Sequence, residues 1–218
     1  MLTLRDVCYR YKKGNQDVLK AATAEMEGGK LHAIVGPSGS GKTTLLSIMA
    51  GLDRPTSGTV LIDGEDLSGL NLDKYRRERI SIIFQAFQLF PLLTAIENVC
   101  YPMEALGKEA VVRARELLGA VGIGEDKHNR YPSNLSGGEQ QRVAIARALS
   151  TGAKVLLADE PTGNLDTANG QIVVDILKKL AHEQGYCVVI VTHNPEIADI
   201  ADQVMRMKDG VLTVLEGR

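Results

Sequence analysis

The 218-residue sequence has no tryptophan, three phenylalanines and three cysteines, and no charge of one sign dominates it. Cys8, Cys100 and Cys187 are odd in number and widely spaced, so neither a disulfide framework nor a zinc pattern fits, and a reducing compartment is the simplest interpretation. Lysine plus arginine total 25, against 27 for aspartate plus glutamate. Nucleic-acid-binding proteins usually carry a basic excess, so this balance argues against nucleic acid as a partner.

Long apolar runs are absent as well. No stretch reaches the ~18 uninterrupted apolar residues of a membrane helix, and a charge at Arg5 comes too early for a signal peptide. With 44% hydrophobic and 24% charged residues, the composition is that of a soluble globular protein. We expect any membrane role to come through a partner, and we expect no regulatory domain after the final apolar runs, which end near Arg218.

Short continuous apolar runs alternate with helical patterns along the chain. The runs are 31–35, 80–84, 154–158 and 187–191, and the helical patterns are 42–50, 108–121, 138–150 and 167–183. This alternation predicts an α/β fold with a mostly parallel core sheet that is flanked by helices and buried on both faces. Strand-like or hairpin patterns at 2–7, 18–26, 59–64 and 203–215 predict antiparallel strands at the margins.

The middle of the chain is mostly helical, which predicts an inserted subdomain. We interpret 87–134 as this helical subdomain, continuing into the helix that follows it, and 1–86 and 135–218 as the core of a single domain.

A glycine-rich loop follows the apolar run 31–35 and opens a helix. It matches the phosphate-binding pattern G-x-x-x-x-G-K-[ST] at every fixed position and reads Gly36-Pro37-Ser38-Gly39-Ser40-Gly41-Lys42-Thr43, followed by Thr44. Glycines let backbone N–H groups point at a phosphate, and the helix start adds partial positive charge. Lys42 would reach the β- and γ-phosphates and the Thr43 hydroxyl would bind Mg²⁺. An incidental Gly-rich turn is the competing interpretation.

Two adjacent carboxylates close the apolar run 155–158. Ligands bind at the carboxyl edge of an open parallel sheet, where Asp159 and Glu160 would stand. Asp159 would hold Mg²⁺ through its water shell, because Mg²⁺ dehydrates reluctantly. Glu160 would polarise the attacking water. Solvated acids before the helix-stopping Pro161 are the alternative.

A second glycine loop opens another helix at Leu135-Ser136-Gly137-Gly138-Glu139-Gln140. Ser136 and Glu139 have the spacing of a capping box. A capping box does not account for two glycines at a helix start, whereas Gly137 and Gly138 would leave N–H groups approachable for a second anion. A nucleotide held between two chains would use both phosphate-binding helix starts.

These three motifs together resemble the nucleotide-binding domain of ABC transporters, over nearly the whole chain. The resemblance implies the ABC ATPase variant of the P-loop NTPase fold, hydrolysis of ATP with Mg²⁺, and a head-to-tail homodimer. It places Thr43, Gln85 and Asp159 at the metal, and Lys42, Ser136, Gly138 and His193 around the γ-phosphate. It makes Tyr11, or less well Tyr9, the aromatic that stacks on adenine, and Asp166 the carboxylate that contacts the partner chain. The catalytic set would be Glu160, His193, Gln85 and Lys42.

Two further runs, 90–99 and 140–149, resemble the subgroup of lipoprotein-release and macrolide-export ATPases. That subgroup implies a separate membrane permease, export or extraction of a hydrophobic substrate, and a cytoplasmic protein peripheral on the inner face of the cell membrane. Ala86 and Asn134 depart from the subgroup pattern, which expects Gln at both positions.

Other ATPases compete with this interpretation. A soluble ABC ATPase acting on DNA would need long heptad arms, and one acting on ribosomes would need two cassettes; the sequence has neither. A nucleotide kinase would account for Lys42 but not for the second glycine loop or for the acidic pair.

The segment after Gln85 is rich in large apolar side chains, namely Phe87, Leu89, Phe90, Pro91, Leu92 and Leu93. Pro91 prevents regular helix pairing, and exposed apolar patches mark interfaces. We therefore expect the permease to dock between Gln85 and Leu93, with Phe84 and Leu93 as candidates for burial in the core.

Overall fold

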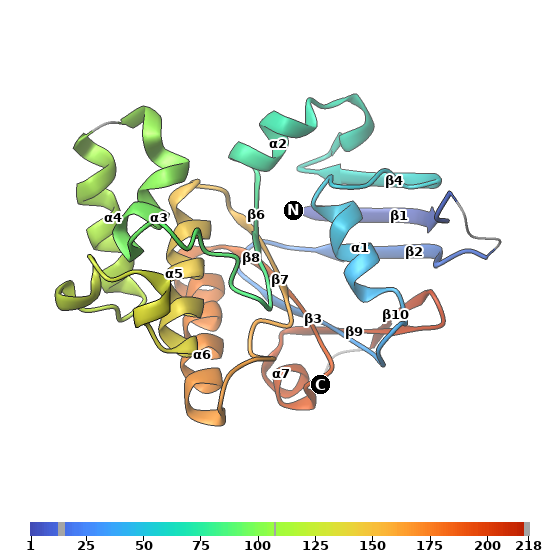
Figure 1. Ribbon diagram of the computed structural model, residues 1–218. Coiled ribbons are helices and arrows are strands. Elements are labelled where there is room, and N and C mark those ends of the chain that lie inside the picture. The colour runs from blue at the N-terminus through green and yellow to red at the C-terminus, as the bar shows by residue number, and fades with distance from the viewer. Residues whose placement is uncertain (13–15, 107, 216–218) are drawn as a thin grey trace.

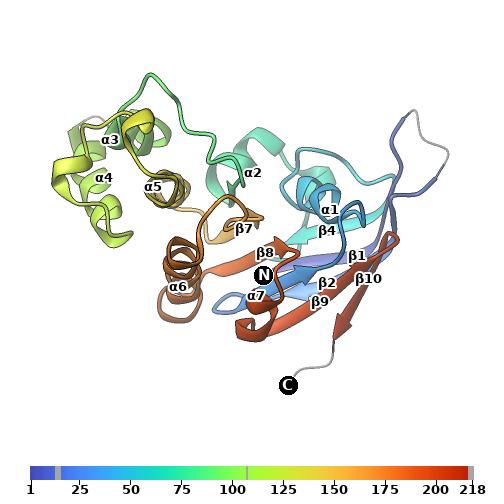
Figure 2. The ribbon, with the colours of Figure 1, turned by 60° about the horizontal axis from the view of Figure 1, so that its bottom comes forward.

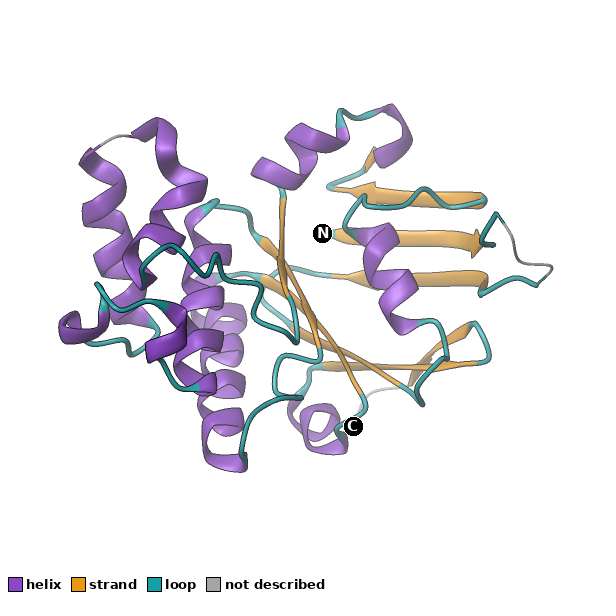
Figure 3. Cartoon of the chain, viewed as in Figure 1, coloured by secondary structure: helices purple, strands orange, loops and turns teal. Residues whose placement is uncertain are grey.

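The computed structural model describes residues 1–12, 16–106 and 108–215. Two sheets organise the chain (Figures 1 and 3): six strands in the order β10-β9-β3-β8-β7-β6, and four in the order β2-β1-β4-β5. The larger sheet contains β3 (Leu31–Val35), β6 (Ile80–Ile83), β7 (Val155–Asp159), β8 (Cys187–Thr192), β9 (Gln203–Lys208) and β10 (Val211–Leu215). The smaller sheet contains β1 (Leu2–Tyr9), β2 (Leu19–Met26), β4 (Ser57–Ile62) and β5 (Glu65–Asp66).

The larger sheet is parallel except at one edge. β6, β7, β8, β3 and β9 pair in parallel, and β10 pairs antiparallel with β9. The prediction of a mostly parallel core sheet is therefore confirmed. The antiparallel strands at the start of the chain form a sheet of their own (Figure 2).

Every residue of β8 is buried, and its side chains alternate between two hydrophobic cores. Val188 and Ile190 lie in the core beneath the long helices, whereas Val189 and Val191 lie in the core shared with the smaller sheet. This placement explains why the run 187–191 has no polar alternation: a strand covered on both faces needs apolar side chains on both.

Helices cover the sheet and extend beyond it. The α-helices are α1 (Lys42–Met49), α2 (Leu72–Glu78), α3 (Ala95–Cys100), α4 (Lys108–Ala120), α5 (Gly137–Ser150), α6 (Thr167–Gln184) and α7 (Pro195–Ile200). Short 3₁₀ helices lie at Leu67–Gly69, Tyr101–Leu106, Glu125–Lys127 and Pro132–Asn134. α3, α4 and α5 pack on one another at the side of the molecule away from the smaller sheet (Figure 1). Among the described residues, every helix is too short or too polar to cross a membrane.

Candidate functional site

The strands of the larger sheet bring four separate segments to one edge. Val35 pairs with Thr192, and Asp159 pairs with Val191, so the carboxyl ends of β3, β7 and β8 lie side by side. β6 joins them, because Ile83 pairs with Ala158. The residues that follow these ends are the glycine-rich loop, Glu160, His193 and Gln85, which are between 33 and over a hundred positions apart in the chain. The edge of a parallel sheet is where ligands bind in open α/β folds.

The glycine-rich loop is tightly held by its neighbours. Gly41 has a φ of 106°, and a Cβ added to Gly36 would lie 2.1 Å from the Met207 carbonyl oxygen, so both positions require glycine. The Lys42 side chain is buried, and its Nζ donates to the carbonyl oxygens of Gly36 (2.9 Å) and Pro37 (3.0 Å). The loop thus holds the Lys42 ammonium group against its own backbone carbonyl groups.

Donor groups of this loop are left available for a ligand. α1 begins at Lys42 without a side-chain cap, which leaves its first N–H groups to a ligand or to water. The Ser40 hydroxyl oxygen is buried and has no hydrogen-bond partner in the described part of the chain. Buried polar groups are normally satisfied, so this pattern fits an anion such as a phosphate.

A cavity of about 650 Å³ opens beside the loop. It is lined by Tyr11, Val18, Ser38, Gly39, Gly41, Lys42, Thr43, Thr44, Gln85, Glu160 and His193. Ten of the residues that the sequence assigned to nucleotide binding or catalysis therefore face one space.

Thr43, which lines the cavity, and Asp159 bring two hard oxygen donors close together. The Thr43 hydroxyl lies 3.4 Å from Asp159 Oδ1. Burial raises the pKa of Asp159 and the Glu160 charge adds to that, whereas the Thr43 hydrogen bond and the Lys42 charge act in the opposite direction. Mg²⁺ typically binds through one or two protein oxygens plus substrate phosphates. This pair fits Mg²⁺, even though the described residues contain no cluster of three metal-ligating side chains.

Glu160 is the most constrained carboxylate of the site. Its backbone is left-handed (φ 46°), and its N–H donates to the Val191 carbonyl oxygen (2.8 Å). The Thr192 hydroxyl donates to Oε2 (3.0 Å), and His193 Nδ1 lies 2.8 Å from Oε1. The carboxylate is only 15% exposed, whereas the His193 side chain is 65% exposed. A fixed carboxylate beside an exposed imidazole can orient a water molecule at the cavity mouth.

Gln85 is fixed by a residue that the sequence analysis did not single out. Gln85 Nε2 donates to Asn164 Oδ1 (3.3 Å), and Asn164 Nδ2 donates back to the Gln85 carbonyl oxygen (3.0 Å). A Cβ on Gly163 would lie 2.8 Å from Gln85 Nε2, so a larger residue there would displace the Gln85 side chain. Of this loop the sequence points only to Asp166, because no local pattern shows which residue lies against Gln85.

Tyr11 stands at the entrance of the cavity. Its hydroxyl lies 3.0 Å from Thr44 Oγ1, and its ring forms a T-shaped pair with the Tyr9 ring, with centroids 5.0 Å apart. The residue is 49% exposed, so its ring is accessible to a planar ligand. This placement favours Tyr11 over Tyr9 as the residue that stacks on a base.

The second glycine loop lies away from this cavity. Ser136 and Glu139 form the expected capping box at the start of α5. A Cβ on Gly138 would lie 2.1 Å from Asn169 Oδ1, and Asn169 Nδ2 donates to Asp166 Oδ2 (2.7 Å). Asn169, another residue that the sequence analysis missed, thus joins the loop to Asp166. None of these residues lines the cavity, and Figure 1 shows α5 well apart from α1.

The ionised Glu139 of the capping box should contribute measurably to stability. Lys127 Nζ donates to Glu139, as does the Ser136 N–H, and the pKa of Glu139 falls to about 2. A lowered pKa in the folded state stabilises the protein above the unfolded pKa of about 4.5, and that contribution is lost as the pH falls towards 2. We expect Glu139→Gln, which keeps the cap, to lower the free energy of unfolding by ~1–2 kcal/mol at pH 7.

Urea unfolding at pH 7 and at pH 3 measures this difference, which should shrink at the lower pH. Glu116→Gln is the matched control, because its pair with Arg113 is exposed and should contribute almost nothing. An equal loss in the two variants, or a Glu139→Gln deficit that grows at pH 3, contradicts the assignment.

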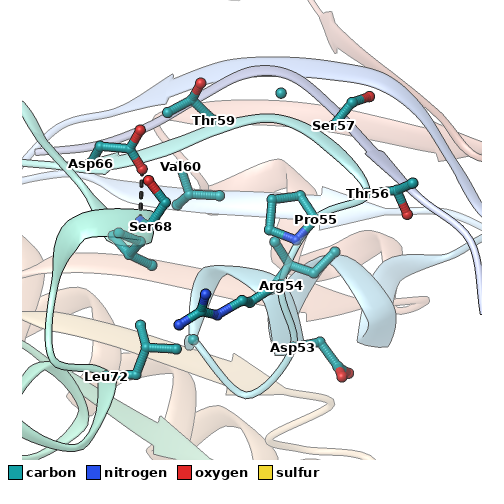
Figure 4. Close-up of a pocket in the computed structure, with 14 residues that line it drawn as sticks. Asp53, Arg54, Pro55, Thr56, Ser57, Thr59, Val60, Asp66, Ser68 and Leu72 are labelled. Atoms are coloured by element: carbon teal, nitrogen blue, oxygen red, sulfur yellow. Dashed lines mark hydrogen bonds between the residues drawn. The ribbon is translucent and has the colours of Figure 1, made fainter.

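A second cavity, of about 290 Å³, lies beside β4 (Figure 4). Arg54, Pro55, Thr59, Asp66 and Ser68 are among its lining residues, and Asp66 accepts a hydrogen bond from the Ser68 N–H (2.7 Å). The glycine-rich loop and the acidic pair contribute nothing to it. The reactive groups gather instead in the cavity that contains Lys42 and Glu160.

A phosphate-binding loop motif after the first strand of a parallel sheet, with a hydroxyl next to its lysine and an acidic strand end nearby, defines a P-loop nucleoside triphosphatase. Comparison with known proteins specifies the family. The ABC transporter family profile matches residues 19–163. The chain is 46% identical to an uncharacterized ABC transporter ATP-binding protein of Thermotoga maritima, over all of this chain and 96% of that one.

It is 44% identical to the macrolide export ATP-binding/permease protein MacB of Escherichia coli K12, over 96% of this chain and 33% of MacB, so it spans a third of that relative's length. Among solved structures, the dimeric ABC transporter cassette MJ0796 matches over the full length of both chains, with 41% identity and a TM-score of 0.89. The same cassette in a post-hydrolysis state with ADP and Pi matches equally well. The chain belongs to the ABC transporter family, as an ATP-hydrolysing subunit of a transport complex.

Proposed function

We propose that two copies of this chain close head-to-tail around two Mg-ATP molecules and drive a separate membrane permease that exports or extracts a hydrophobic substrate. One observation carries the dimer: two glycine-rich helix starts suit phosphates, yet only the first lines the cavity. A second copy turned by a two-fold axis would bring its Ser136 and Gly138 to this cavity. The dimeric form of the similar cassette MJ0796 supports the arrangement.

The polar residues in and around the cavity then have roles in hydrolysis. Tyr11 stacks on adenine, the N–H groups of 36–44 hold the phosphates, and Lys42 turns from its loop carbonyls to the γ-phosphate. Mg²⁺, bound by Thr43, Asp159 and Gln85, would supply charge neutralisation. Glu160 accepts a proton from the attacking water, and His193 contacts the γ-phosphate. Asp166 contacts the partner chain. Catalysis is therefore positioning plus charge stabilisation.

The segment after Gln85 offers a surface to the permease, but the structure changes which side chains form it. Leu89 packs against the core and Phe87 is half-buried near Gly137, so these two were wrong choices for an exposed patch. The buried Asn98 fixes the segment, because it receives the Phe90 N–H (2.8 Å) and donates to the Leu93 carbonyl oxygen (3.0 Å).

Phe90 (39% exposed) and Leu92 (86%) point outward instead. An open groove of about 410 Å³ adjoins Phe90 and is also lined by Gln88, Tyr101, Pro102 and Arg147. We place a cytoplasmic helix of the permease in this groove, which would hold the chain at the inner face of the cell membrane. The likeness to MacB, whose name records macrolide export, supports the outward direction and the hydrophobic substrate.

Leu92→Asp tests this docking. We expect the basal ATPase of the isolated chain to survive, because Leu92 is exposed, while ATPase stimulation by the co-expressed permease falls at least about tenfold. Val112→Asp, on the exposed side of α4, is the matched control (62% exposed) and should behave like the unmodified chain. If Leu92→Asp assembles and transports normally, the docking surface lies elsewhere. ATPase activity that no co-expressed permease stimulates would favour the alternative, a soluble ABC ATPase acting on DNA or ribosomes.

A further inference from the structure

Two consecutive residues in the loop after Gln85 have left-handed backbones. Phe87 has a φ of 57° and Gln88 a φ of 51°, and neither is glycine. Side chains with a Cβ disfavour this region, so a single such residue is uncommon and a pair needs an external cause. Such conformations persist where the surrounding structure enforces them. Only Ala86 separates Gln85 from Phe87.

Arg147 of α5 holds the carbonyl groups of both residues. Its Nη1 donates to the Gln88 carbonyl oxygen (2.6 Å), and its Nη2 donates to the Phe87 carbonyl oxygen (3.3 Å). Its guanidinium carbon also lies 5.6 Å from the centroid of the Phe90 ring. A guanidinium is a rigid fork of donors, so it can fix two neighbouring carbonyl groups at once. The left-handed pair turns its carbonyl groups towards this fork.

The clamped loop connects the elements that the proposed function uses. Gln85, at one end, lines the cavity beside the glycine-rich loop (the nucleotide cavity of the proposed function), and Phe90, at the other end, lies beside the open groove. Arg147 itself lies in the helix that begins with Gly137 and Gly138. One side chain therefore ties the loop between cavity and groove to the helix that would meet the partner's nucleotide.

We propose that Arg147 is a positioning residue that holds 87–88 in the left-handed conformation and thereby fixes Gln85 in the nucleotide cavity. The inference rests on the proposed role of Gln85 at Mg-ATP. The alternative is that Arg147 only packs between α5 and the loop, with no effect on the backbone of 87–88. A glycine substitution at 87–88 distinguishes the two, because glycine adopts the left-handed region without a Cβ penalty and would not need the clamp.

The experiment combines Arg147→Ala with glycine substitutions in the full-length chain. Arg147→Ala should lower ATP turnover about tenfold and speed amide hydrogen exchange at 86–90, because the left-handed pair loses its clamp. Adding Gln88→Gly to Arg147→Ala should raise ATP turnover at least about threefold above that of Arg147→Ala alone, since glycine removes the conformational penalty at one of the two residues. Adding Ala86→Gly, at a residue without a positive φ, is the matched control and should recover nothing.

The outcomes separate this inference from the proposed function. If Gln85→Ala leaves turnover unchanged, the role of Gln85 is wrong, and hydrogen exchange at 86–90 still decides whether Arg147 holds the loop. Unchanged exchange in Arg147→Ala, or equal rescue by Ala86→Gly and Gln88→Gly, overturns the clamp. If Arg147→Ala does not fold, Arg147→Lys takes its place, because a single ammonium cannot match the fork. If Gln88→Gly does not raise the turnover of Arg147→Lys more than Ala86→Gly does, the clamp is also overturned.

Discussion

Glu160→Gln should lower turnover strongly while ATP binding is retained. The amide keeps the shape of the side chain and can still meet Thr192 and His193, whose atoms lie 3.0 Å and 2.8 Å from the carboxylate oxygens. What it loses is the negative charge and the proton-accepting oxygen that orient water. General-base catalysis contributes typically ~10²–10⁴-fold, so we expect the rate to fall at least about a hundredfold.

Single-turnover ATPase and nucleotide-binding measurements check this expectation. With hydrolysis blocked, the ATP-bound dimer should accumulate, and size-exclusion chromatography with Mg-ATP detects it. Glu196→Gln, an acid three residues after His193 that does not line the cavity, is the matched control and should keep its activity. Turnover near the unmodified rate in Glu160→Gln would remove Glu160 as the base.

Ser136→Arg and Lys42→Ala should each be inactive alone and rescue each other when mixed. Lys42 lies in the cavity, whereas Ser136 lies at the start of α5 outside it. In a head-to-tail dimer, one chain's Lys42 and the other chain's Ser136 would complete the same site. A mixed dimer of the two variants therefore has one intact site and one site that carries both changes.

The size of the rescue follows from counting sites. Random pairing makes half of the dimers mixed, and each has one working site of two, so an equal mixture should regain about a quarter of the unmodified activity. ATPase titration of one variant into the other measures it. Ser136→Arg also disturbs the capping box, so Ser136→Ala is compared with it and should cost only ~1 kcal/mol of stability. Normal hydrolysis by Ser136→Arg alone would contradict the shared site.

Much of the fold could be predicted because its signals are local. Continuous apolar runs predicted the parallel strands, and β8, buried throughout, shows why they lack alternation. The phosphate loop was also recognisable, since its glycines, Lys42 and Thr43 are consecutive and their spacing is set by the backbone itself. The capping box of Ser136 and Glu139 is likewise contained in four residues.

The contacts that complete the site were not predictable in this way. Asn164 against Gln85 and Asn169 beneath Gly138 join residues 79 and 31 positions apart, and no local pattern marks either asparagine. The apolar segment 87–93 shows the same limit. Its composition predicted an exposed patch, but Leu89 turned towards the core and Leu92 towards solvent, because a buried Asn98 from the next helix fixes the turn between them.

The phosphate-binding motif, the buried strands and the starts of helices could be inferred from the chain alone, because each of these depends on chain neighbours. Three relations became visible only in the fold: Glu160 meets His193, Arg147 reaches the carbonyl groups of 87–88, and the second glycine loop lies outside the cavity. These relations depend on the order and register of strands in the sheet and on the packing of α5 beside it. Such long-range pairings arise from the whole core, so no short stretch of sequence specifies them.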